Sequence, residues 1–333
     1  MSLPPHVQVR LSRRPPVVID GETLHPNMQL LLTVTRQAGK RRTLSHEDVR
    51  VARARMARST TRFARAVPPV AAVHDVTIMG PGGPLAARHY APPSASPEPL
   101  LVYLHGGGFA LGDLDTHDHP CRALCQLARI HVLSVAYRLA PEHPYPAAVD
   151  DAFAALRYAQ ANAGSFGADP ARVAIGGDSA GGNLATVIAQ RTRDDHPPCA
   201  QLLLYPTVDI AGDWPSRHLF GRGFYLTSAD MDLFNGWYLG AAQRELLQHP
   251  ELSPLRAADH SGLCPALLVT CGFDPLRDEG EAYARKLDTA GTKVTTWREP
   301  GLLHGFVHMA AVSPVADAAL ARVATEFARV VRG

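Results

Sequence analysis

The sequence predicts an α/β fold in which a mostly parallel sheet of about eight strands is covered by helices on both faces. From about residue 100 onward, short apolar runs alternate with amphipathic helical patterns. The runs are almost continuously hydrophobic, as in parallel strands that are buried on both faces. The chain has 333 residues, of which 46% are hydrophobic and 19% charged. This composition is typical of a globular protein with one large domain or two of average size.

The first 66 residues are expected to be helical, because they contain no strand-like alternation. Pro26 lies near the predicted start of one helix, and Gly39 lies near its end. Ser45 and Asp48 form a capping-box pattern that opens a second helix.

A β-hairpin is predicted directly after this helical region. Residues 73–80 and 85–92 alternate between apolar and polar side chains on either side of the sequence "PGGP". This hairpin would add an antiparallel edge to the sheet. The remaining strands are predicted over 100–108, 130–138, 172–177, 200–208, 265–272 and 293–300, and the helices between and after them over 119–129, 148–163, 180–193, 278–291 and 315–332.

A segment rich in aromatic residues, 210–250, interrupts the alternation of strands and helices. An insertion at the carboxyl end of a sheet strand lies where a lid over a site would be expected. Its aromatic residues are Phe220, Phe224, Tyr225, Phe234, Trp237 and Tyr238.

The sequence "GGDSAGGN" at 176–183 puts a serine among glycines, between a predicted strand and a predicted helix. Gly177 and Gly181 lie two residues on either side of Ser179, as the tight turn of a nucleophile elbow requires. A phosphate-binding loop would need a lysine after the glycines, but Asn183 follows them. Taken alone, the pentapeptide is equally compatible with a nucleophile and with a helix N-cap serine.

The sequence "HGGGF" at 105–109 favours the nucleophile interpretation. Three glycines after a predicted strand let backbone N–H groups face a site without obstruction by side chains. Such N–H groups stabilise the oxyanion of a tetrahedral intermediate, and the residue after the nucleophile, Ala180, supplies a further donor.

A serine hydroxyl needs a base, and the base needs an acid that orients it. In this fold class the chain order is serine, acid, histidine. Asp274 follows a predicted strand directly, and His304 lies in the loop after the next strand. Asp278 is the competing acid, but it falls inside a predicted helix start, where a carboxylate also serves as a cap.

With these motifs in order, the chain resembles the hormone-sensitive-lipase-like branch of α/β-hydrolase esterases, also called bacterial family IV. The matching sequences are "HGGGFALGDLDTHD", "YRLAPEHPYPAAVDD", "GGDSAGGNLA", "SPLRA", "DPLRDEG" and "HGF", and the serine context is that of the Gly-Asp-Ser-Ala-Gly subgroup. The resemblance implies an α/β-hydrolase fold with a helical cap. Its functional residues would be the nucleophile Ser179, the base His304, the acid Asp274, and the oxyanion donors Gly107, Gly108 and Ala180.

The resemblance also implies a division of the chain. Residues 1–66 would form the N-terminal cap helices and 210–250 a cap insertion, while 67–209 and 251–333 would form the catalytic core. The stretch 36–65 contains ten lysine or arginine residues. It could bind a membrane surface or a polyanion, but it is interpreted as the solvated outer face of the cap.

The predicted function is that of a serine carboxylesterase acting on fairly apolar esters with short-to-medium acyl chains, without a cofactor. Two alternatives stay open: an amide or formamide hydrolase that uses the same triad, and a ligand receptor without turnover. The sequence "DTHDH" at 115–119 could suggest a metal ion, but it is interpreted as the amino end of a helix. No metal is therefore expected.

The remaining features predict a cytoplasmic protein. Five scattered cysteines without a C-x-x-C pair fit reduced thiols, and the first residues lack the apolar segment of a secretion signal. The net charge of +2 gives no bias toward nucleic acid. The expected partner is a small-molecule ester, and a homodimer is the protein association considered.

Overall fold

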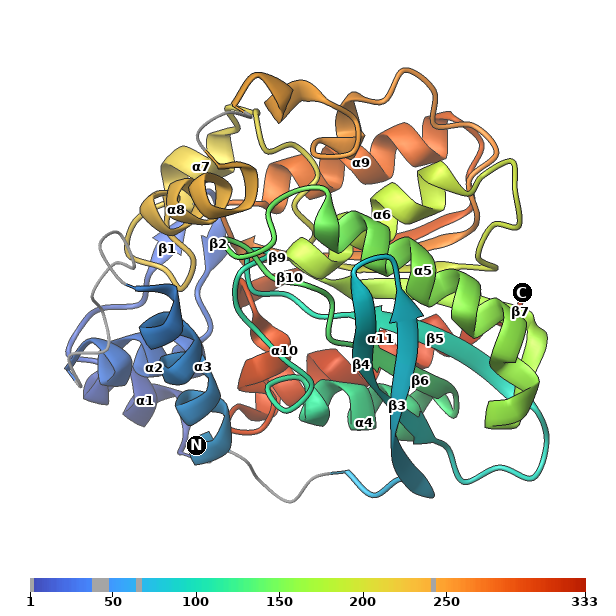
Figure 1. The fold of residues 1–333 in the computed structure, drawn as a ribbon. Helices are drawn as coiled ribbons and strands as arrows, with labels where there is room; N and C mark the ends of the chain where they lie inside the picture. Colours follow the sequence, from blue (N-terminus) through green and yellow to red (C-terminus); the bar gives the residue numbers. More distant parts are fainter. Residues whose placement is uncertain (1–2, 38–47, 64–67, 241–243) are drawn as a thin grey trace.

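The computed structural model describes residues 3–37, 48–63, 68–240 and 244–333. An eight-stranded sheet crosses the molecule in the order β10-β9-β8-β7-β5-β6-β4-β3 (Figure 1). Its strands are β3 (Ala72–Gly80), β4 (Gly83–Ala91), β5 (Glu98–Leu104), β6 (His131–Val135), β7 (Ala168–Asp178), β8 (Gln201–Leu204), β9 (Ala266–Phe273) and β10 (Val294–Leu303).

The predicted hairpin is confirmed as the pair β3 and β4. Its strands pair in antiparallel fashion from Ala72 opposite Ala91 to Gly80 opposite Gly83. β4 is also antiparallel to β6, whereas the pairs from β6 to β10 are all parallel. Parallel strands bring their carboxyl ends to one edge of the sheet, which is where open α/β sheets bind ligands.

Helices cover both faces of the sheet, as predicted (Figure 1). Side chains of β5 alternate between the two resulting cores: Leu100 and Val102 pack into one, and Leu101 and Tyr103 into the other. One face carries α5 (Ala147–Asn162), α6 (Ala180–Arg191) and α9 (Arg277–Thr289), and the other carries α4 (Asp118–Ala128), α10 (Phe306–Met309) and α11 (Pro314–Val330).

The N-terminal region is not purely helical, so this expectation was wrong. Between α1 (Pro5–Leu11) and α2 (Pro26–Gln37), the strands β1 (Val18–Ile19) and β2 (Glu22–Thr23) form a small antiparallel ribbon. Asp20 and Gly21 turn the chain between them with φ values of 56° and 76°, and an Asp-Gly pair is a strong hairpin signal. Strands of two residues are too short to produce an alternating pattern. Gly39 and Ser45 lie outside the described residues.

The segment after β8 contains α7 (Pro215–Phe220), α8 (Ser228–Leu239) and a 3-10 turn over Arg244–Gln248. Further 3-10 turns lie at Ala163–Phe166 and Pro254–Arg256. In the parts of the chain that the structure describes, no helix has both the length and the apolarity needed to cross a bilayer.

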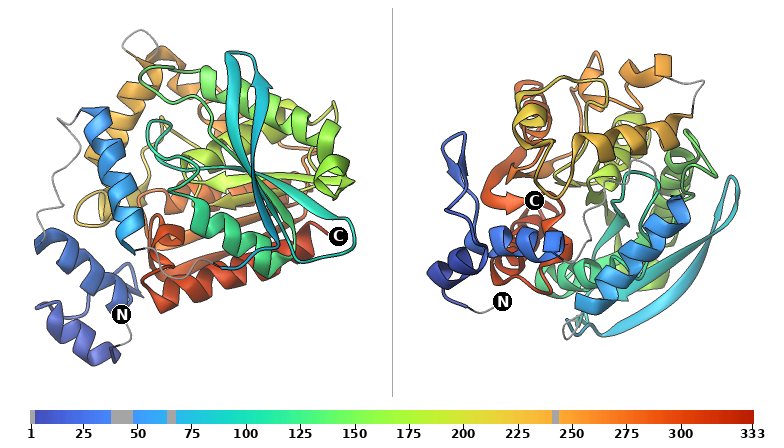
Figure 2. Two further views of the ribbon diagram at one scale, coloured as in Figure 1. Left: turned by 60° about the horizontal axis from the view of Figure 1, so that its bottom comes forward. Right: turned by 90° about the vertical axis from the view of Figure 1, so that its left-hand side faces the viewer.

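Helix α8 lies beside α3 (Val49–Phe63), above the carboxyl end of the sheet (Figures 1 and 2). Val49 and Ala52 of α3 form a small apolar cluster with Leu111, and Phe234 of α8 packs against it. Two segments that are distant in the sequence therefore meet over the loop that follows β5.

Candidate active site

Ser179 lies in a sharp turn between β7 and α6. Its φ and ψ of 53° and −117° are unusual for a residue with a side chain, as expected of a strained strand-to-helix elbow. Gly177 and Gly181 make this turn possible, because a Cβ on either would collide with the carbonyl oxygen of Leu104. The Ser179 N–H donates to the carbonyl oxygen of Leu204 at 2.9 Å. The backbone thus holds the hydroxyl at the carboxyl edge of the sheet.

His304 and Asp274 form a hydrogen-bonded chain with this hydroxyl. The distance from His304 Nε2 to Ser179 Oγ is 2.9 Å, and that from His304 Nδ1 to Asp274 Oδ2 is 2.8 Å. Asp274 is fully buried, and its Oδ1 accepts the N–H of Leu276 at 2.8 Å. Because a carboxylate accepts the Nδ1 proton, Nε2 is left free to accept the serine proton.

The competing acid Asp278 does not reach His304. It lies in the first turn of α9, where its Oδ2 accepts the N–H of Ser216 at 2.8 Å. The structure therefore brings Ser179, His304 and Asp274 together, whereas Asp278 contacts Ser216 from the first turn of α9.

The glycine loop after β5 lies beside the serine turn. Gly107 and Gly108 have φ values of 119° and 61°, a region that favours glycine. In the described part of the chain, their N–H groups have no hydrogen-bond acceptor. Ala180 is the first residue of α6, and the N–H of such a residue has no partner within its helix. The N–H of Gly106 is already used, since it donates to Asp178 Oδ1 at 3.0 Å.

Residues 101–308 match the model of a family described as alpha/beta hydrolase fold. The chain belongs to this family. Carboxylic ester hydrolase LipN of Mycobacterium tuberculosis is 47% identical over 304 residues, which are 88% of this chain and 79% of LipN. Ethyl acetate hydrolase of Pseudomonas putida is 38% identical over 248 residues, which are 73% of this chain and 77% of the hydrolase.

A solved relative has the same overall structure. The crystal structure of a mutant of LAE6, an alpha/beta hydrolase enzyme from the metagenome of Lake Arreo in Spain, superposes on this chain with a TM-score of 0.88. The two sequences are 40% identical, and the match covers 92% of this chain and 98% of LAE6. Together these matches confirm the resemblance to hormone-sensitive-lipase-like esterases.

Two aromatic residues of the 210–250 segment reach this hydrolase site. A Cβ on Gly108 would collide with the ring of Phe234, and a Cβ on Gly305 would lie 3.2 Å from Tyr225. Phe220 and Tyr238 instead have fully buried side chains in the two cores. The aromatic composition of the segment therefore reflects both site lining and ordinary packing, and sequence alone does not separate them.

Asp178 is a residue of the site whose side chain the sequence reasoning overlooked. Its Oδ1 accepts the Tyr103 hydroxyl at 2.8 Å in addition to the N–H of Gly106. Burial raises the pKa of Tyr103 well above its ordinary value, so the phenol stays a neutral donor. The buried carboxylate thus fixes the first residue of the glycine loop. The only signal in the sequence was its place directly before the serine.

The sequence "DTHDH" forms the amino end of a helix, as predicted, because α4 begins at Asp118. Its residue His117, however, is fully buried and faces Asp178. His308 of α10 approaches the same carboxylate. Sequence reasoning did not bring these two histidines together.

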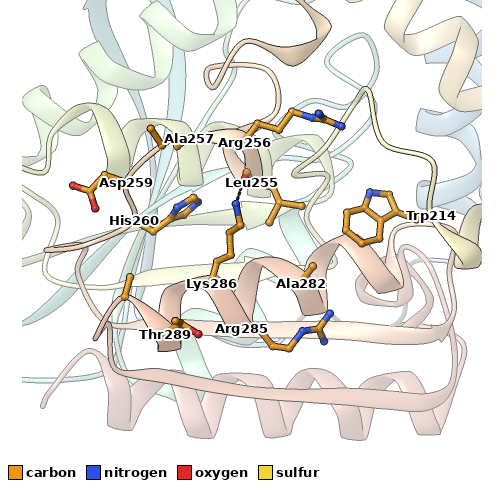
Figure 3. Close-up of a pocket in the computed structure, with 12 residues that line it drawn as sticks. Trp214, Leu255, Arg256, Ala257, Asp259, His260, Ala282, Arg285, Lys286 and Thr289 are labelled. Atoms are coloured by element: carbon orange, nitrogen blue, oxygen red, sulfur yellow. Dashed lines mark hydrogen bonds between the residues drawn. The ribbon is translucent and has the colours of Figure 1, made fainter.

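A cavity of about 660 Å³ lies away from the catalytic residues, between the loop around residue 257 and α9 (Figure 3). Two of its charged side chains have partners within the protein: Lys286 Nζ donates to the carbonyl oxygen of Leu255 at 2.9 Å, and Arg256 pairs with Asp209 at 2.6 Å. Because Lys286 and Arg256 are already bonded within the protein, they do not mark this cavity as a ligand site.

Proposed function

We propose that this chain is a serine carboxylesterase with Ser179 as nucleophile, His304 as general base and Asp274 as the orienting acid. The observation that carries the proposal is the unbroken chain of two hydrogen bonds, 2.9 and 2.8 Å long, that joins the three side chains. The names of the relatives agree with the activity, because LipN is called a carboxylic ester hydrolase and another relative an ethyl acetate hydrolase.

The reaction follows from this geometry. His304 Nε2 takes the Ser179 proton as Oγ attacks the ester carbonyl, and the Asp274 carboxylate stabilises the imidazolium that forms. The N–H groups of Gly107, Gly108 and Ala180 bind the oxyanion. When the intermediate collapses, His304 gives its proton to the leaving alcohol. A water molecule deprotonated by His304 then hydrolyses the acyl-enzyme.

The division into cap and core stays part of the proposal. Residues 1–66 and 210–250 form the cap, and 67–209 with 251–333 form the catalytic core. Support comes from the apolar cluster in which Val49 and Phe234 pack around Leu111 above the glycine loop. An aromatic and aliphatic cover of this kind favours fairly apolar esters with short-to-medium acyl chains.

The decisive experiment compares Ser179→Ala with the unchanged protein on p-nitrophenyl esters from acetyl to decanoyl. Loss of the nucleophile should remove nearly all activity, because residual catalysis would come from binding and the oxyanion donors alone. Ser165→Ala is the matched control, since Ser165 lies on the surface and its hydroxyl donates to the carbonyl oxygen of Asn162. Wild-type activity in Ser179→Ala would overturn the proposal.

The same site could act on amides, because acyl transfer is common to both substrates. Matched ester and anilide substrates decide between the two activities by the ratio of their kcat/KM values. A covalent adduct of an organophosphate at Ser179 would exclude a receptor without turnover.

The cellular compartment and the oligomeric state are also proposals. All five cysteines are free thiols, which supports a reducing compartment such as the cytoplasm. A homodimer through the sheet edge is supported by the position of β10 at the end of the strand order. Light scattering on the purified chain, with and without substitutions on β10, tests the dimer.

A further inference from the structure

Three side chains that the acyl-transfer mechanism does not use for proton transfer converge beside the serine turn. His117 precedes α4, Asp178 ends β7, and His308 lies in α10. One ring nitrogen of each histidine and one carboxylate oxygen of Asp178 all lie within 4.8 Å of one another. His117 and Asp178 are almost completely buried, and 15% of the His308 side chain is exposed. Three elements distant in the sequence thus bring two imidazoles and one carboxylate together.

Thr116 is the hydrogen-bond partner of His117 Nδ1. Thr116 Oγ1 donates its single proton to the carbonyl oxygen of Asp113 at 2.9 Å and lies 3.0 Å from His117 Nδ1. When the hydroxyl proton points to this carbonyl oxygen, the hydroxyl accepts from His117 and Nδ1 carries a proton. In the neutral ring, Nε2 then has a bare lone pair. This nitrogen is buried, has no hydrogen-bond partner among the described residues, and faces the carboxylate of Asp178.

A lone pair directed at a buried carboxylate is repulsive unless a positive charge lies between them. That charge could be a proton on Nε2 or a metal ion, and the length of the contacts favours the metal ion. His117 Nε2 lies 3.4 Å from Asp178 Oδ1, and His308 Nε2 lies 3.7 Å from Oδ2. A charge-assisted N–H···O bond would be about 2.7–2.9 Å long. Two ligand atoms at about 2.1 Å from a tetrahedral ion are instead about 3.4 Å apart.

We propose that His117, Asp178 and His308 form a site for one divalent first-row transition-metal ion. Two imidazoles with one carboxylate suit zinc or iron(II), whereas magnesium and calcium prefer all-oxygen sites. The second shell is partly built: Thr116 holds the far nitrogen of His117, and Tyr103 and Gly106 hold Asp178 Oδ1. Contacts of this kind orient metal ligands.

The ion would be structural, since esterase chemistry at Ser179 does not require it. It would tie the end of β7, which carries the nucleophile, to α10, which follows the His304 loop. We therefore expect binding to raise the unfolding temperature and to persist in a protein that cannot turn over substrate.

The test uses the full chain after treatment with a chelator and its removal. Zinc is titrated by calorimetry, cobalt(II) is followed by its visible absorption as a probe of tetrahedral nitrogen and oxygen ligands, and thermal unfolding is measured with and without zinc. We expect one ion per chain and a higher unfolding temperature. His117→Gln and His308→Gln should each weaken zinc binding by at least about a hundredfold.

The controls separate this site from other sources of binding. His119→Gln, two residues from His117, should bind zinc as the unchanged protein does. Ser179→Ala should also bind zinc normally, so that failure of the esterase proposal would leave this one intact. If His117→Gln does not fold, His308→Gln decides, because its side chain is more exposed.

Three results would each overturn the proposal. One is the absence of stoichiometric zinc or cobalt binding. Another is binding that neither histidine substitution weakens. The last is a nitrogen NMR spectrum, recorded with zinc in excess, in which both ring nitrogens of His117 carry protons, because a proton would then supply the positive charge.

Discussion

Two histidine–aspartate groups flank Ser179, and they differ in the nitrogen that faces the carboxylate. In His304 it is Nδ1, at 2.8 Å from Asp274, and Nε2 is free for the serine. In His117 it is Nε2, at 3.4 Å from Asp178, while Nδ1 is held by Thr116. The same pair of residue types is thus arranged for proton transfer in one place and for holding a cation in the other. The partner of the second nitrogen decides the role.

The two carboxylates also differ in their other contacts. Asp274 accepts one further N–H, from Leu276, within its own loop. Asp178 accepts the Tyr103 hydroxyl and the N–H of Gly106, which belong to β5 and the glycine loop. Beyond the histidine, Asp274 therefore contacts only its own loop in the hydrogen bonds described above, whereas Asp178 connects segments of the fold. Substitutions at the two positions should separate catalysis from stability.

The largest effect is expected for Asp274→Asn. The amide can no longer hold the His304 tautomer that leaves Nε2 free, and kcat should fall by about 10⁴-fold, as the same substitution causes in a serine protease with a Ser-His-Asp triad. The unfolding temperature should change little. Steady-state kinetics and calorimetry measure both.

Asp278→Asn is the control for this comparison. Asp278 contacts Ser216 and does not contact the histidine, so kcat should stay within a few fold. An equal loss of kcat in both variants would contradict the assignment of Asp274 as the acid.

A smaller effect on rate and a larger effect on stability are expected for Asp178→Asn. Replacing the carboxylate weakens its charge-assisted hydrogen bonds with Gly106 and Tyr103, each worth about 1.5–3 kcal/mol. The free energy of unfolding should fall by about 1.5–3 kcal/mol in total, because the bonds are weakened and not removed. The glycine loop should become less rigid, and kcat should fall by about tenfold. Chemical denaturation with parallel kinetics measures the two. A rate loss as large as that of Asp274→Asn, with unchanged stability, would break the distinction between the carboxylates.

The smallest effect on kcat concerns a histidine pair without a carboxylate. His89 Nε2 lies 3.0 Å from His131 Nδ1, and burial lowers the pKa of His89 to about 4. Between pH 6.5, its ordinary pKa, and pH 4, the unfolded chain binds a proton that the folded chain does not. Stability is therefore lost as the pH falls through this window.

His89→Gln should make this loss shallower by at most one proton, or about 1.4 kcal/mol per pH unit. Denaturant unfolding at several pH values between 4 and 7 measures the slope. His196→Gln is the control, because 85% of the His196 side chain is exposed, and it should leave the slope unchanged. If His89→Gln and the unchanged protein have the same slope, His89 does not contribute to the loss of stability at low pH.

The sequence by itself determined the alternating strands and helices and the residues that meet at the sheet edge. Ser179, Asp274 and His304 each follow a predicted strand, and the carboxyl ends of parallel strands share one edge. Their proximity could therefore be predicted from local patterns. Gly107 and Gly108 were identified for the same reason.

Only the tertiary structure decided which side chains from different elements meet around the carboxyl edge of the sheet. His117, Asp178 and His308 carry no common spacing, and Phe234 reaches Gly108 from a segment in which Phe220 is simply buried. The strands of the β1–β2 ribbon were likewise too short to leave an alternating pattern. Periodicity reports the exposure of residues within one element. Contacts between elements depend on how their surfaces pack, and that is set by the whole fold.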